Sequence, residues 1–314
     1  MPTFEVLIQE CFNKINTNKD LSPVDNKYLF SLINDFEDGK WRSSKFHQFI
    51  WNNVAQTALS TEERNSLIDK SETLLIKSAQ NLRLTDKDKE EVDNIGRGSE
   101  LAEICLYGIM KEYYKALPVV PKIFHKQNVN DNAKGADSVH IVITDSDYTL
   151  WFGEAKFYNS IDDTRFDTII KSVENALVTE KLKKENSIIT DLKDIDELVK
   201  NKALVERIRE DLNYSNSIDK LKPKIHIPIL IIYECNKTQR QSSLTEEYKE
   251  EIIQYHKNRA QSYFEKQISK LKESIVSYDK ITFHLILFPV PNKKDIVDRF
   301  IAKVESRKEE AQNG

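Results

Sequence analysis

Glycine is scarce in this sequence, with seven residues in a chain of 314. None of them lies between Glu154 and Glu310. The phosphate-binding loops of ATPases and the Gly-x-Gly-x-x-Gly turn of dinucleotide-binding enzymes need several glycines close together, because only glycine lets the backbone approach a phosphate closely. Neither motif is present, which argues against ATPase, kinase and dinucleotide-dependent oxidoreductase functions.

Cysteine and long apolar runs are also scarce. Cys11, Cys105 and Cys235 are widely spaced and odd in number, which is typical of a reducing cytoplasm and argues against a disulfide framework or a structural zinc site. The longest uncharged apolar stretch, Ile281–Asn292, contains a histidine and two prolines. It is shorter than the ~20 residues that span a bilayer. The start of the chain lacks the pattern of a secretory signal. We therefore expect a cytoplasmic protein with no membrane contact.

Positive charge is not in excess. Lys and Arg number 47 against 51 Asp and Glu, which gives a formal net charge of -4. Proteins that wrap nucleic acid over a broad surface neutralise many phosphates with Lys and Arg. Any contact with nucleic acid must therefore be local, or be supplied by a partner.

The first 95 residues differ in pattern from the rest. Apolar residues recur at three- and four-residue spacing, which predicts helices over Asn26–Phe36, Ser44–Leu59 and Ser60–Asn81. Ser60 and Glu63 form a capping box at the start of the third segment. We interpret residues 1–95 as a helical docking or regulatory region, and residues 96–314 as a second domain.

The second region alternates between helical and β-rich segments. The loop Gly96-Arg97-Gly98-Ser99 leads into it. The predicted order is a helix at Ser99–Lys115, β-rich runs at Lys122–Gln127, Ser138–Thr144 and Tyr148–Phe157, helices at Ile161–Lys184 and Asp191–Leu212, a strand at Ile225–Tyr233, a helix at Thr245–Lys272, a strand at Ile281–Val290 and a helix at Asn292–Arg307. Two strands, Ile225–Tyr233 and Ile281–Val290, are almost wholly apolar, so we expect them in the centre of a sheet. This order predicts an α/β sandwich with a mixed sheet.

A hairpin is predicted around the turn Thr144-Asp-Ser-Asp147. If the turn centres between Asp145 and Ser146, Val139 pairs with Phe152. Ile141 then pairs with Leu150, and Ile143 with Tyr148. This register gives the hairpin one consistent apolar face.

The same register places Asp137 opposite Glu154, and Lys156 projects to the same side because side chains alternate along a strand. Two carboxylates this close repel each other unless they share a cation. With the backbone carbonyl of Ala155 they would form a partial oxygen cage that suits Mg²⁺ or Mn²⁺. Such an ion acidifies a bound water and neutralises charge on a phosphate under attack. Lys156 would orient the water or stabilise the pentavalent phosphorus.

A carboxylate on the preceding helix is expected to join this site. Glu103 lies within the apolar run Leu101–Leu106. A charged side chain on a buried helix is costly, so we expect it to have a function. Glu100 lies in the first helical turn, where a carboxylate complements the helix dipole without any further function. We favour Glu103 and keep Glu100 as the second choice. Either would hold a second metal or an ordered water.

Other residues near this motif carry weaker signals. Tyr158 and Lys171 follow it closely and are candidates for phosphate contact. We interpret both as ordinary surface positions.

Asp137 followed, after sixteen residues, by Glu154-Ala155-Lys156 resembles the motif of the PD-(D/E)xK nuclease superfamily. The core of that superfamily is a helix, three strands, a helix and a further strand, and the resemblance covers about residues 96–290. The residue before Asp137 is Ala136, whereas the PD-(D/E)xK motif has proline at this position. More narrowly, three short stretches resemble HamA, the nuclease subunit of the bacterial Hachiman anti-phage system: Glu103-Ile-Cys-Leu-Tyr107, Gly135-Ala-Asp137 and Gly153-Glu-Ala-Lys-Phe-Tyr158.

The resemblance implies a restriction-endonuclease-like core and Mg²⁺- or Mn²⁺-dependent cleavage of DNA. It also implies a helicase partner, HamB-like, in a hetero-complex that detects aberrant or invading DNA and controls the nuclease. Two alternatives stay open at this stage. One is a catalytically silent module of the same fold that docks a helicase or sensor, and the other is a hydrolase of RNA or of a nucleotide.

Overall fold

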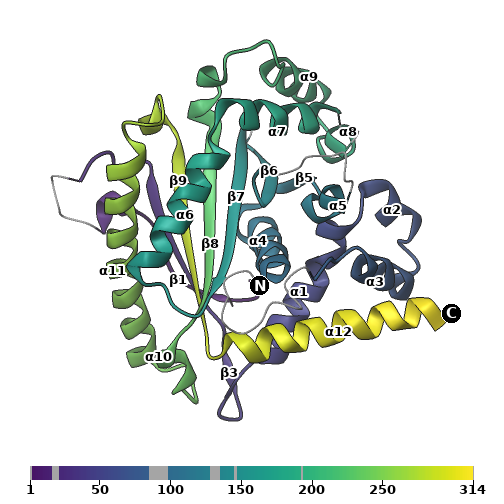
Figure 1. Cartoon of the computed structure of the whole chain (residues 1–314), viewed down its shortest axis with the longest axis vertical. Helices are drawn as coiled ribbons and strands as arrows, with labels where there is room; N and C mark the ends of the chain where they lie inside the picture. Colours follow the sequence, from purple (N-terminus) through teal and green to yellow (C-terminus); the bar gives the residue numbers. More distant parts are fainter. Residues whose placement is uncertain are drawn as a thin grey trace.

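A seven-stranded mixed sheet forms the centre of the structure, with helices on both of its faces (Figure 1). The computed structural model describes residues 2–15, 21–84, 98–127, 135–144, 147–191 and 194–313. The strand order is β1-β2-β9-β8-β7-β6-β5. The strands are β1 Glu5–Cys11, β2 Lys27–Ile33, β5 Leu117–Val120, β6 Ser138–Ile143, β7 Tyr148–Tyr158, β8 Ile225–Glu234 and β9 Thr282–Val290, with a separate ribbon of β3 Phe36–Glu37 and β4 Lys40–Trp41.

The central strands are parallel and the outer ones antiparallel. β7, β8, β9 and β2 pair in parallel, whereas β1 at one edge and the β6–β5 pair at the other add antiparallel strands. Leu230 of β8 and Leu285 of β9 have no exposed surface and belong to the apolar clusters on opposite faces of the sheet. Both strands are apolar because helices cover both of their faces. The prediction of two central strands is confirmed.

The helices form one layer on each face of the sheet. They are α1 Ser43–Ala58, α2 Thr61–Ser66, α3 Ser71–Gln80, α4 Ser99–Tyr114, α5 Lys122–Gln127, α6 Asp163–Ala176, α7 Thr179–Asp191, α8 Asp194–Leu198, α9 Lys202–Asp211, α10 Asn236–Gln239, α11 Glu246–Leu271 and α12 Lys293–Asn313, with short 3₁₀ turns at Phe12–Lys14, Ile218–Lys220, Lys222–Lys224 and Tyr278–Lys280. One apolar cluster joins α6, α7, α9 and α11 to the sheet, and a second joins α1, α4 and α12 to the other face. In Figure 1, α6 and α11 lie across the front of the strands. None of the helices in the described ranges is long and apolar enough to cross a membrane.

β7 alternates between these two layers. Phe152 and Tyr158 belong to the cluster under α6, whereas Ala155 and Phe157 belong to the cluster under α4. The even-numbered residues of β7 therefore face α6, because side chains alternate along a strand.

The predicted hairpin register is confirmed. Val139 pairs with Phe152, Ile141 with Leu150 and Ile143 with Tyr148. The centre of the predicted turn, residues 145–146, and the predicted loop residues 96–97 lie outside the described part of the chain.

The helix predicted over Asn26–Phe36 is wrong, because most of this segment is strand β2. β2 pairs in parallel with β9 and antiparallel with β1. Its apolar residues follow each other closely because both of its faces are covered, and such a run cannot be told from a buried helix by periodicity alone. The N-terminal region is therefore only partly helical. The central sheet includes strands from both sides of residue 95, where the sequence predicted a boundary.

Three further segments differ from their predictions. Lys122–Gln127, predicted as β-rich, is helix α5, and the preceding residues form strand β5 at the edge of the sheet, where Pro118 is tolerated. The long helices predicted over 161–184 and 191–212 are divided into α6, α7, α8 and α9. The helix predicted from Ser60 to Asn81 is two helices, α2 and α3, although the capping box of Ser60 and Glu63 is present as predicted.

Candidate active site

The side chains of Asp137, Glu154 and Lys156 meet where β6 begins beside β7. The backbone N–H of Asp137 donates to the carbonyl oxygen of Gly153 at 2.8 Å, which holds Asp137 next to the residues that follow Gly153. Its Oδ2 atom lies 3.1 Å from the backbone nitrogen of Ala155 and 3.4 Å from Nζ of Lys156. The structure therefore brings the three residues of the predicted motif together, and we call them the Asp137–Glu154–Lys156 cluster.

Glu154 is the most buried member of this cluster, with 4% of its surface exposed. Its Oε1 atom accepts hydrogen bonds from the Lys156 ammonium and from the hydroxyl of Ser172 on α6. Burial raises the pKa of Glu154, and the nearby Asp137 carboxylate raises it further against the opposing effect of Lys156 and Ser172. In the folded chain alone, two ionised carboxylates at this place are therefore unfavourable.

The Lys156 ammonium is shared between the two carboxylates. Burial by itself would lower the pKa of Lys156, but Asp137 and Glu154 together outweigh burial and raise it above its usual value. Lys156 therefore remains a cation at neutral pH. With both acids ionised, the cluster has two negative charges and one positive charge.

The oxygen atoms at this place fit a hard divalent cation. The Ala155 N–H points at Asp137, and in a strand the carbonyl of a residue lies on the same side as its own N–H, so the Ala155 carbonyl faces the side of Asp137 as well. Mg²⁺ and Mn²⁺ prefer such carboxylate and carbonyl ligands, with water completing the coordination. Within the described ranges, no group of three or more His, Cys, Asp or Glu side chains could hold a metal ion. An ion held by Asp137 and Glu154 would complete its coordination with the Ala155 carbonyl and water.

The two candidate glutamates of α4 differ in their surroundings. Glu100 accepts hydrogen bonds from the backbone N–H groups of Arg83 at 2.8 Å and Leu84 at 2.9 Å, so its carboxylate fixes the segment that follows α3. Glu103 is 5% exposed and lies on α4, which contacts both β6 and β7. α4 covers the face of β7 that Ala155 and Phe157 point to, opposite the face of Glu154 and Lys156, so no described contact places either glutamate at the cluster. The role of Glu103 there stays a prediction.

A buried ion pair lies beside Gly135, two residues before Asp137. The Lys122 ammonium of α5 contacts both carboxylate oxygens of Glu185 on α7, and both side chains are almost fully buried. A Cβ atom added at Gly135 would collide with the Glu185 carboxylate. Gly135 therefore allows the backbone just before Asp137 to rest against this carboxylate, which links the ion pair to the position of the site.

Sequence reasoning missed Ser172, Glu185 and Lys122 as neighbours of the site. No signal in the sequence could have found them, because Ser172 reaches Glu154, and the Lys122–Glu185 pair reaches Gly135, only through the packing of helices. The interpretation of Tyr158 as a surface residue is wrong, since it is 2% exposed, whereas Lys171 is exposed as expected.

Comparison with known proteins identifies the family. A family model described as HamA matches residues 9–304 of the chain, from the first strand into the last helix. A search of curated proteins found no match. The match covers far more than the three short stretches that carry the resemblance in the sequence. The chain therefore belongs to the HamA family, a component of the Hachiman anti-phage defence system.

Proposed function

We propose that this chain is a metal-dependent DNA nuclease that acts as the effector of the Hachiman system under the control of a helicase partner. The observation that carries the proposal is the meeting of a buried carboxylate, a partly buried one and an ammonium group in the Asp137–Glu154–Lys156 cluster. Clusters that combine desolvation with closely spaced like charges are typical of catalytic sites.

Asp137, Glu154 and the Ala155 carbonyl would hold Mg²⁺ or Mn²⁺. The bound ion would supply an acidified water and would neutralise negative charge on the phosphate under attack. Ser172 keeps the Glu154 carboxylate in one orientation by donating a hydrogen bond to it. The hydrogen bond from the Ala155 N–H does the same for Asp137.

Lys156 acts as a fixed cation. Because its pKa is raised, its ammonium donates hydrogen bonds and does not act as a general base. It would hold the attacking water or stabilise negative charge that develops on the phosphate oxygens. The prediction that Glu103 holds a second metal or an ordered water is kept as part of the proposal.

The overall charge of -4 supports dependence on a partner. A chain without excess positive charge has few phosphate contacts of its own, so its intrinsic affinity for DNA should be low and should fall with salt. We propose that a helicase delivers DNA to the site in the cytoplasm, and that residues 1–95 contribute to the docking surface. The isolated chain should then cleave DNA weakly.

A cleavage assay with the partner present tests the proposal. The native chain, Glu154→Ala and Lys156→Ala would be compared in Mg²⁺ and in EDTA on duplex DNA, single-stranded DNA and RNA. We expect both substitutions, and EDTA, to lower the cleavage rate at least about a hundredfold. Glu250→Ala and Lys272→Ala remove an exposed glutamate and an exposed lysine from the α11 region and serve as matched controls.

Two outcomes would contradict the proposal. Normal cleavage by both site variants would place the catalytic centre elsewhere. A native chain that binds its partner but cleaves none of the three nucleic acids would instead be the catalytically silent docking module.

A further inference from the structure

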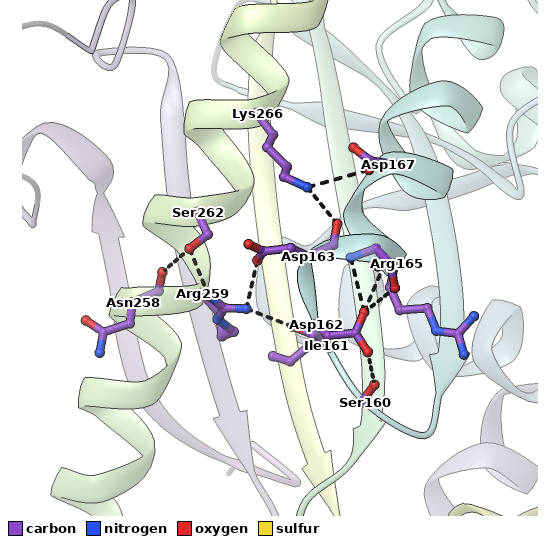
Figure 2. Close-up of polar contacts among 11 residues, drawn as sticks. Ser160, Ile161, Asp162, Asp163, Arg165, Asp167, Asn258, Arg259, Ser262 and Lys266 are labelled. Atoms are coloured by element: carbon purple, nitrogen blue, oxygen red, sulfur yellow. Dashed lines mark hydrogen bonds and ion pairs between the residues drawn. The ribbon is translucent and has the colours of Figure 1, made fainter.

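Three basic side chains of α11 that lie beside α6 are paired with acids of α6. Arg259 of α11 donates to Asp163 and to the carbonyl oxygen of Ile161, and Lys266 donates to the carbonyl oxygen of Asp163 and pairs with Asp167 (Figure 2). Lys270 pairs with Asp167 as well. We call these contacts the α6–α11 network. Its basic side chains are neutralised by neighbours within the chain.

Arg165 lies in the first turn of the same helix but differs from these residues. Figure 2 shows its guanidinium pointing away from α11 and from the α6–α11 network. It forms no ion pair with any carboxylate of the described residues, and its enclosed Nε atom has no hydrogen-bond partner among them. The side chain as a whole is half-buried. Arg165 is thus a cation that the described chain leaves unmatched.

Tyr158 connects Arg165 to the candidate active site. It follows Glu154 and Lys156 on the same side of β7, and its ring lies under the Arg165 guanidinium, with 5.5 Å from the guanidinium carbon to the ring centroid. Burial is the largest cause that raises the pKa of Tyr158, while Lys156 and Arg165 lower it and the two carboxylates raise it. The phenol therefore lies within electrostatic reach of both the cluster and Arg165.

The backbone of Arg165 is held firmly. Asp162 caps α6 by accepting hydrogen bonds from the backbone N–H groups of Thr164 and Arg165, and Ser160 donates to the second oxygen of Asp162. The α6–α11 network fixes the same turn from the other side. A side chain on a backbone that is already fixed loses less entropy when it binds a ligand.

We propose that Arg165, oriented by the ring of Tyr158, binds a phosphodiester phosphate adjacent to the one that is cleaved at the Asp137–Glu154–Lys156 cluster. The proposal rests on the proposed function, because it takes this cluster as the site of cleavage. A guanidinium suits this role because its planar N–H groups match two phosphate oxygens at once, and it always carries its charge. The contact would be independent of base sequence, since it involves only the nucleic-acid backbone.

The test measures binding without cleavage. Fluorescence anisotropy of a labelled DNA oligonucleotide, in EDTA at low salt, would give the affinity of the full-length chain and its dependence on salt. We expect Arg165→Gln to weaken binding about tenfold and to reduce the slope of log affinity against log salt by about one. Arg165→Lys should recover only part of this loss. The same loss is expected on a second oligonucleotide of unrelated sequence.

Lys270→Gln is the matched control, because it removes one positive charge from the neighbouring helix at a side chain that is already paired with Asp167. It should leave the affinity unchanged. Tyr158→Leu should weaken binding like Arg165→Gln, and Tyr158→Phe, which keeps the ring, should restore it. An oligonucleotide with uncharged methylphosphonate linkages should bind equally to the native chain and to Arg165→Gln.

Equal affinity of Arg165→Gln and the native chain for the charged oligonucleotide would overturn the inference, as would the absence of any binding by the native chain. A difference that persists on methylphosphonate DNA would show a contact to base or sugar, and would overturn the phosphate assignment. The proposed function fails separately. If Arg165→Gln weakens binding but the native chain with its partner cleaves nothing in Mg²⁺, the phosphate site stands and the nuclease proposal falls.

Discussion

The α6–α11 network and the Asp137–Glu154–Lys156 cluster are both groups of acids and bases, but they differ in exposure and in balance. In the network, Asp163 and Asp167 keep about half of their side-chain surface exposed, and Arg259, Lys266 and Lys270 pair with them. Such surface pairs contribute little to stability. In the cluster, two carboxylates that are 17% and 6% exposed share one ammonium.

We interpret this difference as one between charges that serve the fold and charges that serve the proposed function. Two acids side by side are costly to a fold, because burial and mutual repulsion both oppose their ionisation. The Lys122–Glu185 pair differs from both the network and the cluster, because it is buried and joins one acid to one base. Substitutions in these three groups should therefore have different effects on stability and activity.

The largest effect on stability is expected at the buried, balanced pair. Lys122→Met removes the ammonium that contacts Glu185, so it should lower the free energy of unfolding by about 3–5 kcal/mol. Urea unfolding followed by circular dichroism measures the change. The double variant Lys122→Met with Glu185→Leu should recover part of the loss, since no acid is then left buried alone. A loss below about 1 kcal/mol would show that this pair resembles the exposed network after all.

A substitution in the Asp137–Glu154–Lys156 cluster should lower activity but not stability. Glu154→Gln keeps the size of the side chain but removes the repulsion with Asp137, so the melting temperature in EDTA should not fall. Cleavage with the partner should fall at least about a hundredfold, because a ligand of the proposed metal is lost. Mg²⁺ should raise the melting temperature of the native chain more than that of Glu154→Gln, because only the native site binds it well. A large drop in melting temperature without loss of cleavage would reverse the assignment of this cluster.

A buried neutral histidine provides a further contrast with these charged groups. His256 lies between Ser31, at 2.5 Å from Nδ1, and Tyr233, at 2.7 Å from Nε2, and burial lowers its pKa to about 3 from the ordinary 6.5. Because its folded-state pKa is lowered, its contribution to stability is complete above pH 6.5 and is lost as the pH falls from 6.5 toward 3. We expect His256 to account for a loss of about 3 kcal/mol between pH 6.5 and pH 4.

Urea unfolding at several pH values measures this loss. His256→Gln should make the acid side of the stability profile less steep. A remaining slope is expected, since burial also lowers the pKa values of His47, His140, His226 and His284. An identical slope in the native chain and the variant would contradict the contribution of His256.

The smallest effect is expected in the α6–α11 network. Lys270→Ala removes one of the two bases that pair with Asp167 and leaves Lys266 in place. The melting temperature should change by less than about 2 °C, and added salt should reduce even this difference. Differential scanning calorimetry at low and high salt measures both. A large, salt-independent drop would mean that the network contributes to the fold as strongly as the buried pair.

Some features of the fold and site were predictable because they depend on residues close together in the chain. The alternation of side chains and the turn chemistry at Thr144–Asp147 were sufficient to pair Val139 with Phe152, and the same register carried Asp137 to Glu154 and Lys156. The apolar runs of β8 and β9 indicated central strands for a similar local reason. The composition alone excluded glycine-rich nucleotide sites.

Other features could not be predicted, because they depend on which surfaces meet in three dimensions. The segment Lys27–Ile33 forms a strand because β9 and β1 lie beside it, and its apolar pattern alone suits a buried helix equally well. Ser172 reaches Glu154, and Tyr158 lies beneath Arg165, only because α6 packs across β7. The local sequence thus determined the candidate motif and its register. The tertiary structure decided what surrounds the motif, because burial and the pairing of charges depend on contacts between residues far apart in the chain.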